Sequence, residues 1–160
     1  MTSNFDIRQL PEFNVAIFSF LLNFVWEMWQ APFYEGLTGS SHWEGIVICS
    51  RATFGDVGIA ILAYYIVTIF SGSRNWVSLP QRWEQLLFIG VGIAVTVVIE
   101  ALATGPMARW SYGSLMPTVP LLGTGLLPML QWLAIPPLVL WFVRRQLHGY
   151  KGQRNLGTRQ

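Results

Sequence analysis

QLLFIGVGIAVTVVIEALAT, residues 85–104, is an uninterrupted apolar stretch in which Glu100 is the one ionisable residue. A helix needs about 20 mostly apolar residues to cross the hydrocarbon core of a membrane, so this stretch predicts a transmembrane helix. Three further stretches have similar length and few charges, over residues 13–34, 46–70 and 118–143. The sequence therefore predicts an all-α, polytopic membrane protein with four transmembrane helices and short loops.

The composition points to the same class. Of the 160 residues, 52% are hydrophobic and 11% are charged, which lies outside the usual range of soluble domains. No hydrophilic stretch is long enough for a second domain, so residues 1–160 are expected to form one transmembrane domain. The first apolar stretch follows no basic segment and contains no small-residue cleavage pattern, so we expect it to be retained rather than removed as a signal peptide.

The basic residues predict the orientation. Cytoplasmic loops and tails of membrane proteins are enriched in Lys and Arg. Arg74 and Arg82 lie in the second loop, which an even number of crossings places on the same side as both termini. We therefore expect cytoplasmic termini, and a multi-pass protein of the bacterial inner membrane because apolar helices exclude an outer-membrane barrel. The tail over residues 144–160 is basic, and we interpret it as a topology signal rather than a nucleic-acid binding segment. Its basic residues are Arg144, Arg145, Lys151, Arg154 and Arg159.

Polar side chains interrupt the apolar stretches at helical spacing. Asp56, Glu100 and Gln131 all fall in the half of the membrane away from the termini. An unpaired amide in hydrocarbon costs several kcal/mol, so Gln131 is expected to hydrogen-bond to another helix. The first predicted helix carries four polar residues, Ser19, Asn23, Glu27 and Gln30, at intervals of four, four and three. This spacing places them on one face of the helix as a polar stripe.

Glu27, Asp56 and Glu100 are the candidate catalytic residues. An ionisable group at membrane depth costs about 2.5 to 3.5 kcal/mol on insertion scales, so these side chains are expected to face the bundle interior. A carboxyl group in a medium of low dielectric can remain protonated near neutral pH, as a proton donor requires. The structural alternative is that Arg51 and Arg109 neutralise the acids in ion pairs, although the acids outnumber these bases.

Amide, aromatic and basic side chains in the same region would bind and orient a substrate. Aromatic faces stabilise cations and suit a lipid or isoprenoid chain, although Trp110 also fits an interfacial aromatic belt. Gly55 and Gly58 are small residues expected to let a neighbouring helix approach closely. The candidate substrate-binding residues are Asn23, Trp26, Gln30, Arg51, Arg109, Trp110, Tyr112, Gln131 and Trp132.

The residue types argue against a metal centre or a redox cofactor. The chain has two histidines, His42 and His148, and one cysteine, Cys49. A bis-histidine haem or a histidine-rich diiron or copper centre cannot be built by this chain alone, because His148 lies in the cytoplasmic tail. We therefore expect neither a metal nor a cofactor.

The order of polar residues resembles that of small polytopic proteins of the lycopene-cyclase and emopamil-binding type. The matching residues are Glu100 followed by Trp110, Pro128 followed by Gln131, and acids on the first two helices. Those families enclose acids, an amide and tryptophans between short-looped helices, and carry out proton-initiated cyclisation or double-bond isomerisation of isoprenoids and sterols. The resemblance implies acid/base chemistry on a lipid or isoprenoid, with membrane lipids and a hydrophobic small molecule as partners.

Two other functions stay open. The chain could be a small non-catalytic subunit of a larger membrane complex that contains pigment or lipid, or it could form a homo-oligomer. It could also be a proton-coupled transporter that uses Glu27 on its first helix. A transporter needs a path across the membrane, and residues 61–70, 86–95 and 138–143 contain no acid or base.

Overall fold

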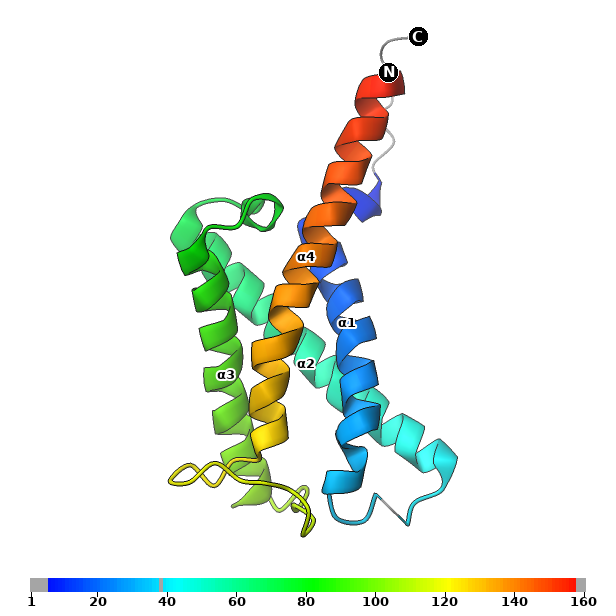
Figure 1. Ribbon diagram of the computed structural model, residues 1–160, viewed down its shortest axis with the longest axis vertical. Coiled ribbons are helices and arrows are strands. Elements are labelled where there is room, and N and C mark those ends of the chain that lie inside the picture. The colour runs from blue at the N-terminus through cyan, green and yellow to red at the C-terminus, as the bar shows by residue number, and fades with distance from the viewer. Residues whose placement is uncertain (1–5, 38, 158–160) are drawn as a thin grey trace.

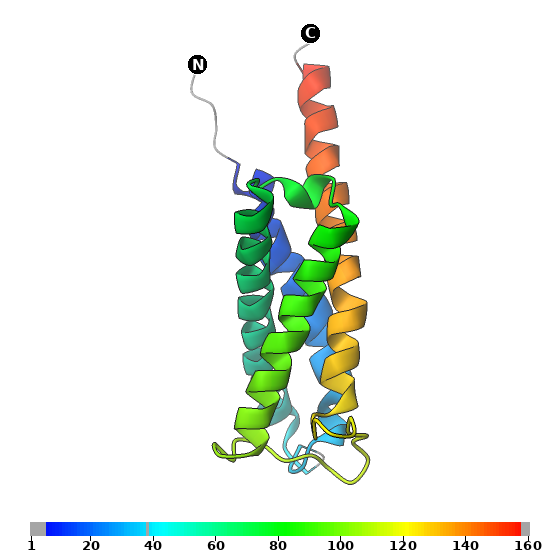
Figure 2. The ribbon, with the colours of Figure 1, turned by 90° about the vertical axis from the view of Figure 1, so that its left-hand side faces the viewer.

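The computed structural model describes residues 6–37 and 39–157 and is all-helical. Figures 1 and 2 show an up-down-up-down bundle in which each helix packs against the next and the last packs against the first. The predicted all-α architecture of four helices is confirmed. Within the described residues the long helices are α1 (Pro11–Gln30), α2 (His42–Ser71), α3 (Arg82–Thr104) and α4 (Leu126–Gly157).

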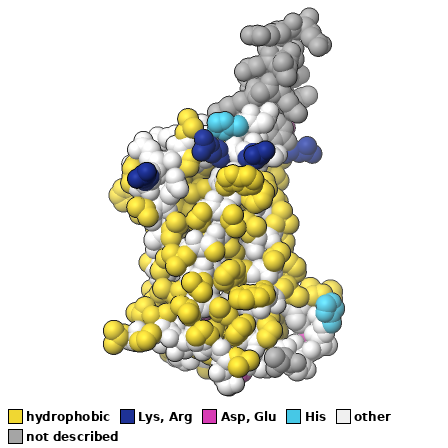
Figure 3. Space-filling model, viewed as in Figure 1, with side chains coloured by type: hydrophobic (Ala, Val, Ile, Leu, Met, Phe, Trp, Pro, Cys, Tyr) yellow, Lys and Arg dark blue, Asp and Glu magenta, His cyan; other side chains and the backbone are white. Residues whose placement is uncertain are grey.

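Three of these helices are long and apolar enough to cross a membrane, namely α2, α3 and the part Leu126–Gly149 of α4. This length and composition are those of a multi-pass membrane protein. Hydrophobic side chains cover the wall of the bundle, and Lys and Arg side chains gather at the end where the described chain begins and ends (Figure 3). The α1 helix is not among the three, because its polar stripe lowers its hydropathy.

Local signals explain where α2 and α3 begin. A capping box precedes α2, in which Ser41 Oγ accepts from the Glu44 backbone N–H and the Glu44 carboxylate accepts from the Ser41 N–H. The helix therefore begins at His42 rather than at residue 46. The Gln81 N–H donates to Glu84 at 2.6 Å, so α3 begins at Arg82 rather than at residue 85.

The helix predicted over 118–143 was wrong at both ends. Residues 118–125 form a loop, because prolines 117 and 120 lack backbone donors and because Leu121 and Gly123 have positive φ angles of 74° and 65°. At the other end α4 continues to Gly157. A chain that leaves the membrane need not stop being helical, since its backbone hydrogen bonds are internal. Arg159 lies outside the described residues.

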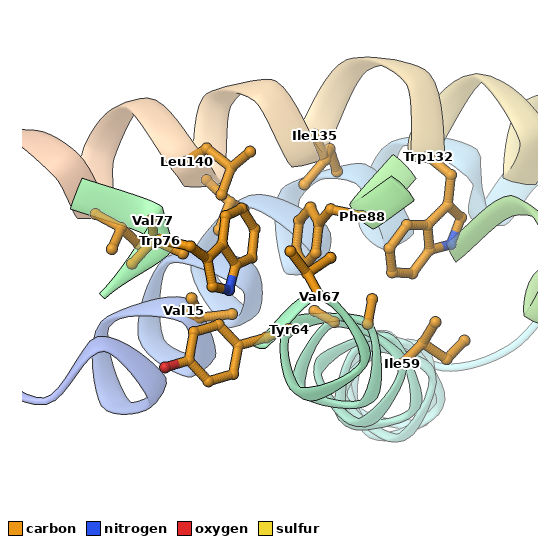
Figure 4. Packing of buried hydrophobic residues seen from close by; sticks show 14 of the residues in the cluster. Val15, Ile59, Tyr64, Val67, Trp76, Val77, Phe88, Trp132, Ile135 and Leu140 are labelled. Atoms are coloured by element: carbon orange, nitrogen blue, oxygen red, sulfur yellow. The ribbon is translucent and has the colours of Figure 1, made fainter. Parts of the chain in front are cut away.

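An aromatic core fills the half of the bundle nearer the termini (Figure 4). The rings of Tyr64 and Trp76 lie 6.0 Å apart and those of Trp76 and Phe88 lie 5.7 Å apart. The Tyr64 hydroxyl donates to the backbone carbonyl of Arg74 at 2.7 Å, and the Arg74 guanidinium pairs with Glu12. This half of the bundle is therefore closed by packed side chains.

Helices α3 and α4 approach each other closely at Gly92 on α3. A Cβ atom placed there would lie 1.9 Å from Cε3 of Trp132, so α3 and the Trp132 ring of α4 can meet because residue 92 has no side chain. At Gly55 and Gly58 an added Cβ meets no atom within 4 Å. The expectation that these two glycines pack against another helix of this chain was wrong.

Candidate functional site

Gln131 joins three helices in the half of the bundle away from the termini. Its Nε2 donates to Asn23 Oδ1 on α1 at 2.8 Å and to Asp56 Oδ2 on α2 at 2.9 Å, and it lies 3.3 Å from Glu27 Oε1. An amide nitrogen has two hydrogens, so one of them is shared between two acceptors. The residue is 2% exposed. The predicted hydrogen bond from Gln131 to another helix is confirmed.

The polar stripe of α1 forms a second part of the network. Gln30 Nε2 donates to Glu27 Oε1 at 2.7 Å, and Trp26 Nε1 donates to Gln30 Oε1 at 3.0 Å. Asn23 Nδ2 donates to the Ser19 carbonyl at 2.8 Å. The spacing of three and four residues brings these groups together along the helix, so Gln30 joins Trp26 to Glu27, and Asn23 is held by the backbone of its own helix.

Glu100 on α3 belongs to a separate cluster in the same half of the bundle. Its Oε2 accepts from the Tyr112 hydroxyl and lies 3.4 Å from Trp110 Nε1. The Tyr112 oxygen in turn accepts from the Gly125 N–H at 2.9 Å. Burial and the hydrogen bond to the Glu100 carboxylate raise the pKa of Tyr112 above its usual value, so its hydroxyl keeps its proton and acts as a donor.

Two loops cover this end of the bundle. The Glu35 N–H donates to the Ser111 carbonyl at 3.0 Å, and the Ser111 hydroxyl donates to Glu35 Oε2 at 2.6 Å. Tyr34 and Tyr112 form an isolated antiparallel bridge beside this contact. The segment from Gly105 to Gly125 is therefore fastened to the α1–α2 connection above Glu100.

Tyr34 lies beside the candidate site, and the sequence analysis did not name it among the site residues. Burial raises its pKa, and the negative charges of Glu100, Glu27 and Asp56 raise it further, so the hydroxyl lies in the field of all three acids. Tyr34 follows Glu27 by seven residues, which is two helical turns, and this spacing was the available signal. The 3₁₀ turn Ala31–Phe33 then carries the chain over the end of the bundle.

Tyr112→Phe is expected to loosen the covering loop. The change removes the donor to Glu100 and the acceptor for Gly125, which should cost about 1 to 3 kcal/mol. Hydrogen exchange at the Gly125 amide should be faster than in the unaltered protein. The matched control is Tyr65→Phe, because the Tyr65 side chain is 44% exposed and should leave both quantities unchanged. Equal protection of Gly125 in both variants would show that the hydroxyl does not hold the loop.

The remaining predicted residues lie apart from the acids. Arg51 and Arg109 are exposed, and neither forms an ion pair with Glu27, Asp56 or Glu100. The ion pair found among the described residues joins Arg74 and Glu12 at the other end of the bundle. The structural alternative, in which these two arginines neutralise the acids, is therefore not what the structure shows. Trp132 is buried on α4 with its ring against Gly92.

Comparison with models of protein families, with characterised proteins and with solved structures finds no match to this chain. The resemblance to lycopene-cyclase and emopamil-binding proteins stays a prediction, and the chemistry of the site is the basis for a function. That chemistry is of one kind: buried or half-buried carboxyl groups are held by amide, phenol and indole donors, and no ion pair to them is found in the described part of the chain.

Proposed function

We propose that this chain is an integral membrane enzyme that moves protons to and from a lipid or isoprenoid, promoting cyclisation or double-bond isomerisation without a redox cofactor. The observation that supports it most is the shared donation by Gln131 to Glu27 and Asp56 in the bundle interior. The proposed location is a bacterial inner membrane, with both termini in the cytoplasm.

The proposal includes α1 as a fourth membrane span. Its 20 residues extend about 30 Å, which is the thickness of the hydrocarbon core. Ile17, Leu21 and Val25 are exposed on its outer face, while Asn23 and Glu27 are buried. A helix in water would place these faces the other way round, so this arrangement favours lipid around α1. The cations at the end that carries the termini favour a cytoplasmic end there.

Two neighbouring carboxyl groups that share one donor repel each other strongly when both are ionised. The Glu27–Asp56 pair is therefore suited to hold one proton between its two groups, as paired carboxyls in other enzymes do. Gln131 and Gln30 donate to Glu27, and these hydrogen bonds stabilise the carboxylate that remains after the proton has left. The pair thus has the properties of a reusable proton donor.

The proposed reaction conserves protons. A carboxylic acid of the Glu27–Asp56 pair protonates one carbon of a double bond and leaves a carbocation on the other. Loss of a proton from a neighbouring carbon to a carboxylate then forms a new double bond, directly for isomerisation or after ring closure for cyclisation. Aromatic rings stabilise such a cation, and Trp26 and Trp110 are the indoles that hydrogen-bond within the two acid clusters.

The subunit alternative is favoured by one observation on α2. Arg51, Gly55 and Gly58 follow one another at intervals of four and three residues and are all exposed. Such a face would suit a helix of another protein. The transporter alternative has no comparable support, because the packed core around Tyr64 and Trp76 closes the other half of the bundle.

The experiment that tests the proposal is native mass spectrometry of the chain in mild detergent, followed by extraction of bound molecules. An isoprenoid or sterol at about one per chain, lost in Gln131→Leu and kept in the control Thr96→Val, would support it. A stable complex with another protein in fixed ratio, and no small molecule, would favour the subunit alternative and contradict the enzyme.

A further inference from the structure

A small cavity lies where all four helices meet, next to Gln131. Its volume is about 10 Å³, which is on the scale of one water molecule. Its wall is mostly apolar, but a few polar groups reach it from α1 and α4. The lining residues that matter here are Ser19, Asn23, Gln131, Trp132 and Pro136.

Ser19 supplies the first polar group. It is 1% exposed, and its hydroxyl has no hydrogen-bond partner in the described part of the chain. Hydroxyl groups within helices commonly donate to the carbonyl four residues earlier, as Thr53, Thr68 and Thr104 do here at 2.8, 2.9 and 2.7 Å. Ser19 does not, so its hydroxyl is free to bind a group in the cavity that it lines.

The prolines of α4 expose the second polar group, a backbone carbonyl. A helical carbonyl accepts from the N–H four residues later, and proline has none. Pro136 therefore leaves the Trp132 carbonyl without its helical donor, and Pro137 removes the donor one position further on. The carbonyl of a helical residue points along the axis toward residue i+4, so this oxygen lies between Trp132 and Pro136, which both line the cavity.

Gln131 supplies the third polar group of the cavity, its amide oxygen. Its amide nitrogen is fully used by Asn23, Glu27 and Asp56. Its Oε1 accepts none of the hydrogen bonds found among the described residues, although the residue is buried and lines the cavity. Ser19 Oγ therefore offers a donor, and the Trp132 carbonyl and Gln131 Oε1 offer two acceptors, to a space of the size of one water molecule, which makes two to four hydrogen bonds when buried. The Trp132 indole N–H is a further buried donor without a partner among the described residues.

We propose that this cavity is a binding site for one water molecule, which accepts from Ser19 Oγ and donates to the Trp132 carbonyl and to Gln131 Oε1. The oxygen and nitrogen of an amide are nearly equal in shape, so packing alone does not decide which way Gln131 faces. The water holds Oε1 on the cavity side and directs Nε2 to the acids. Gln131 is thus oriented by a bound water, and the consequence for proton transfer rests on the proposed function.

Infrared spectroscopy of the full chain in lipid bilayers tests the site. In a comparison of H₂¹⁶O with H₂¹⁸O, a buried water gives an O–H stretching band that shifts to lower frequency with the heavier isotope. We expect such a band in the unaltered protein and its loss in Ser19→Ala. Thr96→Val is the control, because Thr96 also has a buried hydroxyl without a partner among the described residues but does not line the cavity. This control should keep the band.

A second variant keeps the test decisive if Ser19→Ala does not fold. Pro136→Ala restores an N–H for the Trp132 carbonyl, so the band should move in frequency as the water loses one acceptor. Absence of any isotope-sensitive band, or a band that neither Ser19→Ala nor Pro136→Ala alters, would overturn the proposal. A band with the expected responses in a protein without turnover would establish the water site and count against the enzyme alone.

Discussion

Glu27→Gln and Asp56→Asn are each expected to lower proton transfer by about 10²- to 10⁴-fold while leaving the bundle folded, since this is the range that a positioned acid or base contributes. An amide has nearly the same shape as a carboxyl group and can hydrogen-bond to Gln131, so the contacts of the cluster should be kept. It cannot release a proton to a double bond. The expected loss is therefore a loss of chemistry rather than of structure.

The measurement is the incorporation of deuterium from D₂O into the co-purified isoprenoid, with the chain reconstituted in lipid vesicles. A reaction that begins by protonating a double bond and ends by releasing a proton introduces solvent deuterium into the lipid. Glu12→Gln is the matched control, because this acid pairs with Arg74 at the opposite end of the bundle. Deuterium incorporation at the unaltered rate in both Glu27→Gln and Asp56→Asn would refute the role of the pair.

The polar network could be predicted from spacing because polar groups within apolar helices need partners inside the bundle. Asn23, Glu27 and Gln30 recur at helical intervals, and a polar group at membrane depth must find a partner inside the bundle. The bonds from Gln131 to Asn23 and Asp56 follow from this requirement. The spacing therefore predicts that these polar groups meet inside the bundle, although it could not assign which oxygen accepts from which donor.

The exposure of the arginines and the loop before α4 could not be predicted from the sequence. Arg51 was expected to lie with the acids, as a substrate-binding residue or an ion-pair partner. Arg has a long apolar stem that can lie along an apolar surface with its charge outside, so Arg51 is exposed. The apolar composition of residues 118–125 resembles a helix, whereas the positive φ angles of Leu121 and Gly123 make it a loop. Composition does not report a backbone angle.

Glycine contacts could not be predicted from the sequence either. Gly55, Gly58 and Gly92 all lie within apolar helices, and nothing in the local pattern separates the one that packs closely from the two that do not. The difference depends on the rotation of each helix about its axis, which is set by contacts with residues far away in the chain. At Gly92 that contact is the Trp132 ring.

Gly92→Ala is expected to cost about 1 to 3 kcal/mol of stability, the usual range for overpacking a filled core. The new Cβ would lie 1.9, 2.3 and 2.6 Å from three atoms of the Trp132 ring. Trp132 is 3% exposed and belongs to the core cluster, so its ring cannot turn away without displacing other buried side chains. The midpoint of thermal or denaturant unfolding in detergent should fall accordingly.

Gly90→Ala separates this clash from the general effect of removing a glycine. It lies on the same helix, and its added Cβ meets no atom within 4 Å, so stability should stay the same or rise by about 0.5 to 1 kcal/mol. Equal stability of the two variants would show that the ring is not seated on Gly92. If Gly92→Ala alone is destabilised, the contact with the Trp132 ring fixes the rotation of α4. Gln131 directly precedes Trp132 in the chain, so the rate of deuterium incorporation should then also fall in Gly92→Ala. Gly90→Ala should keep the normal rate.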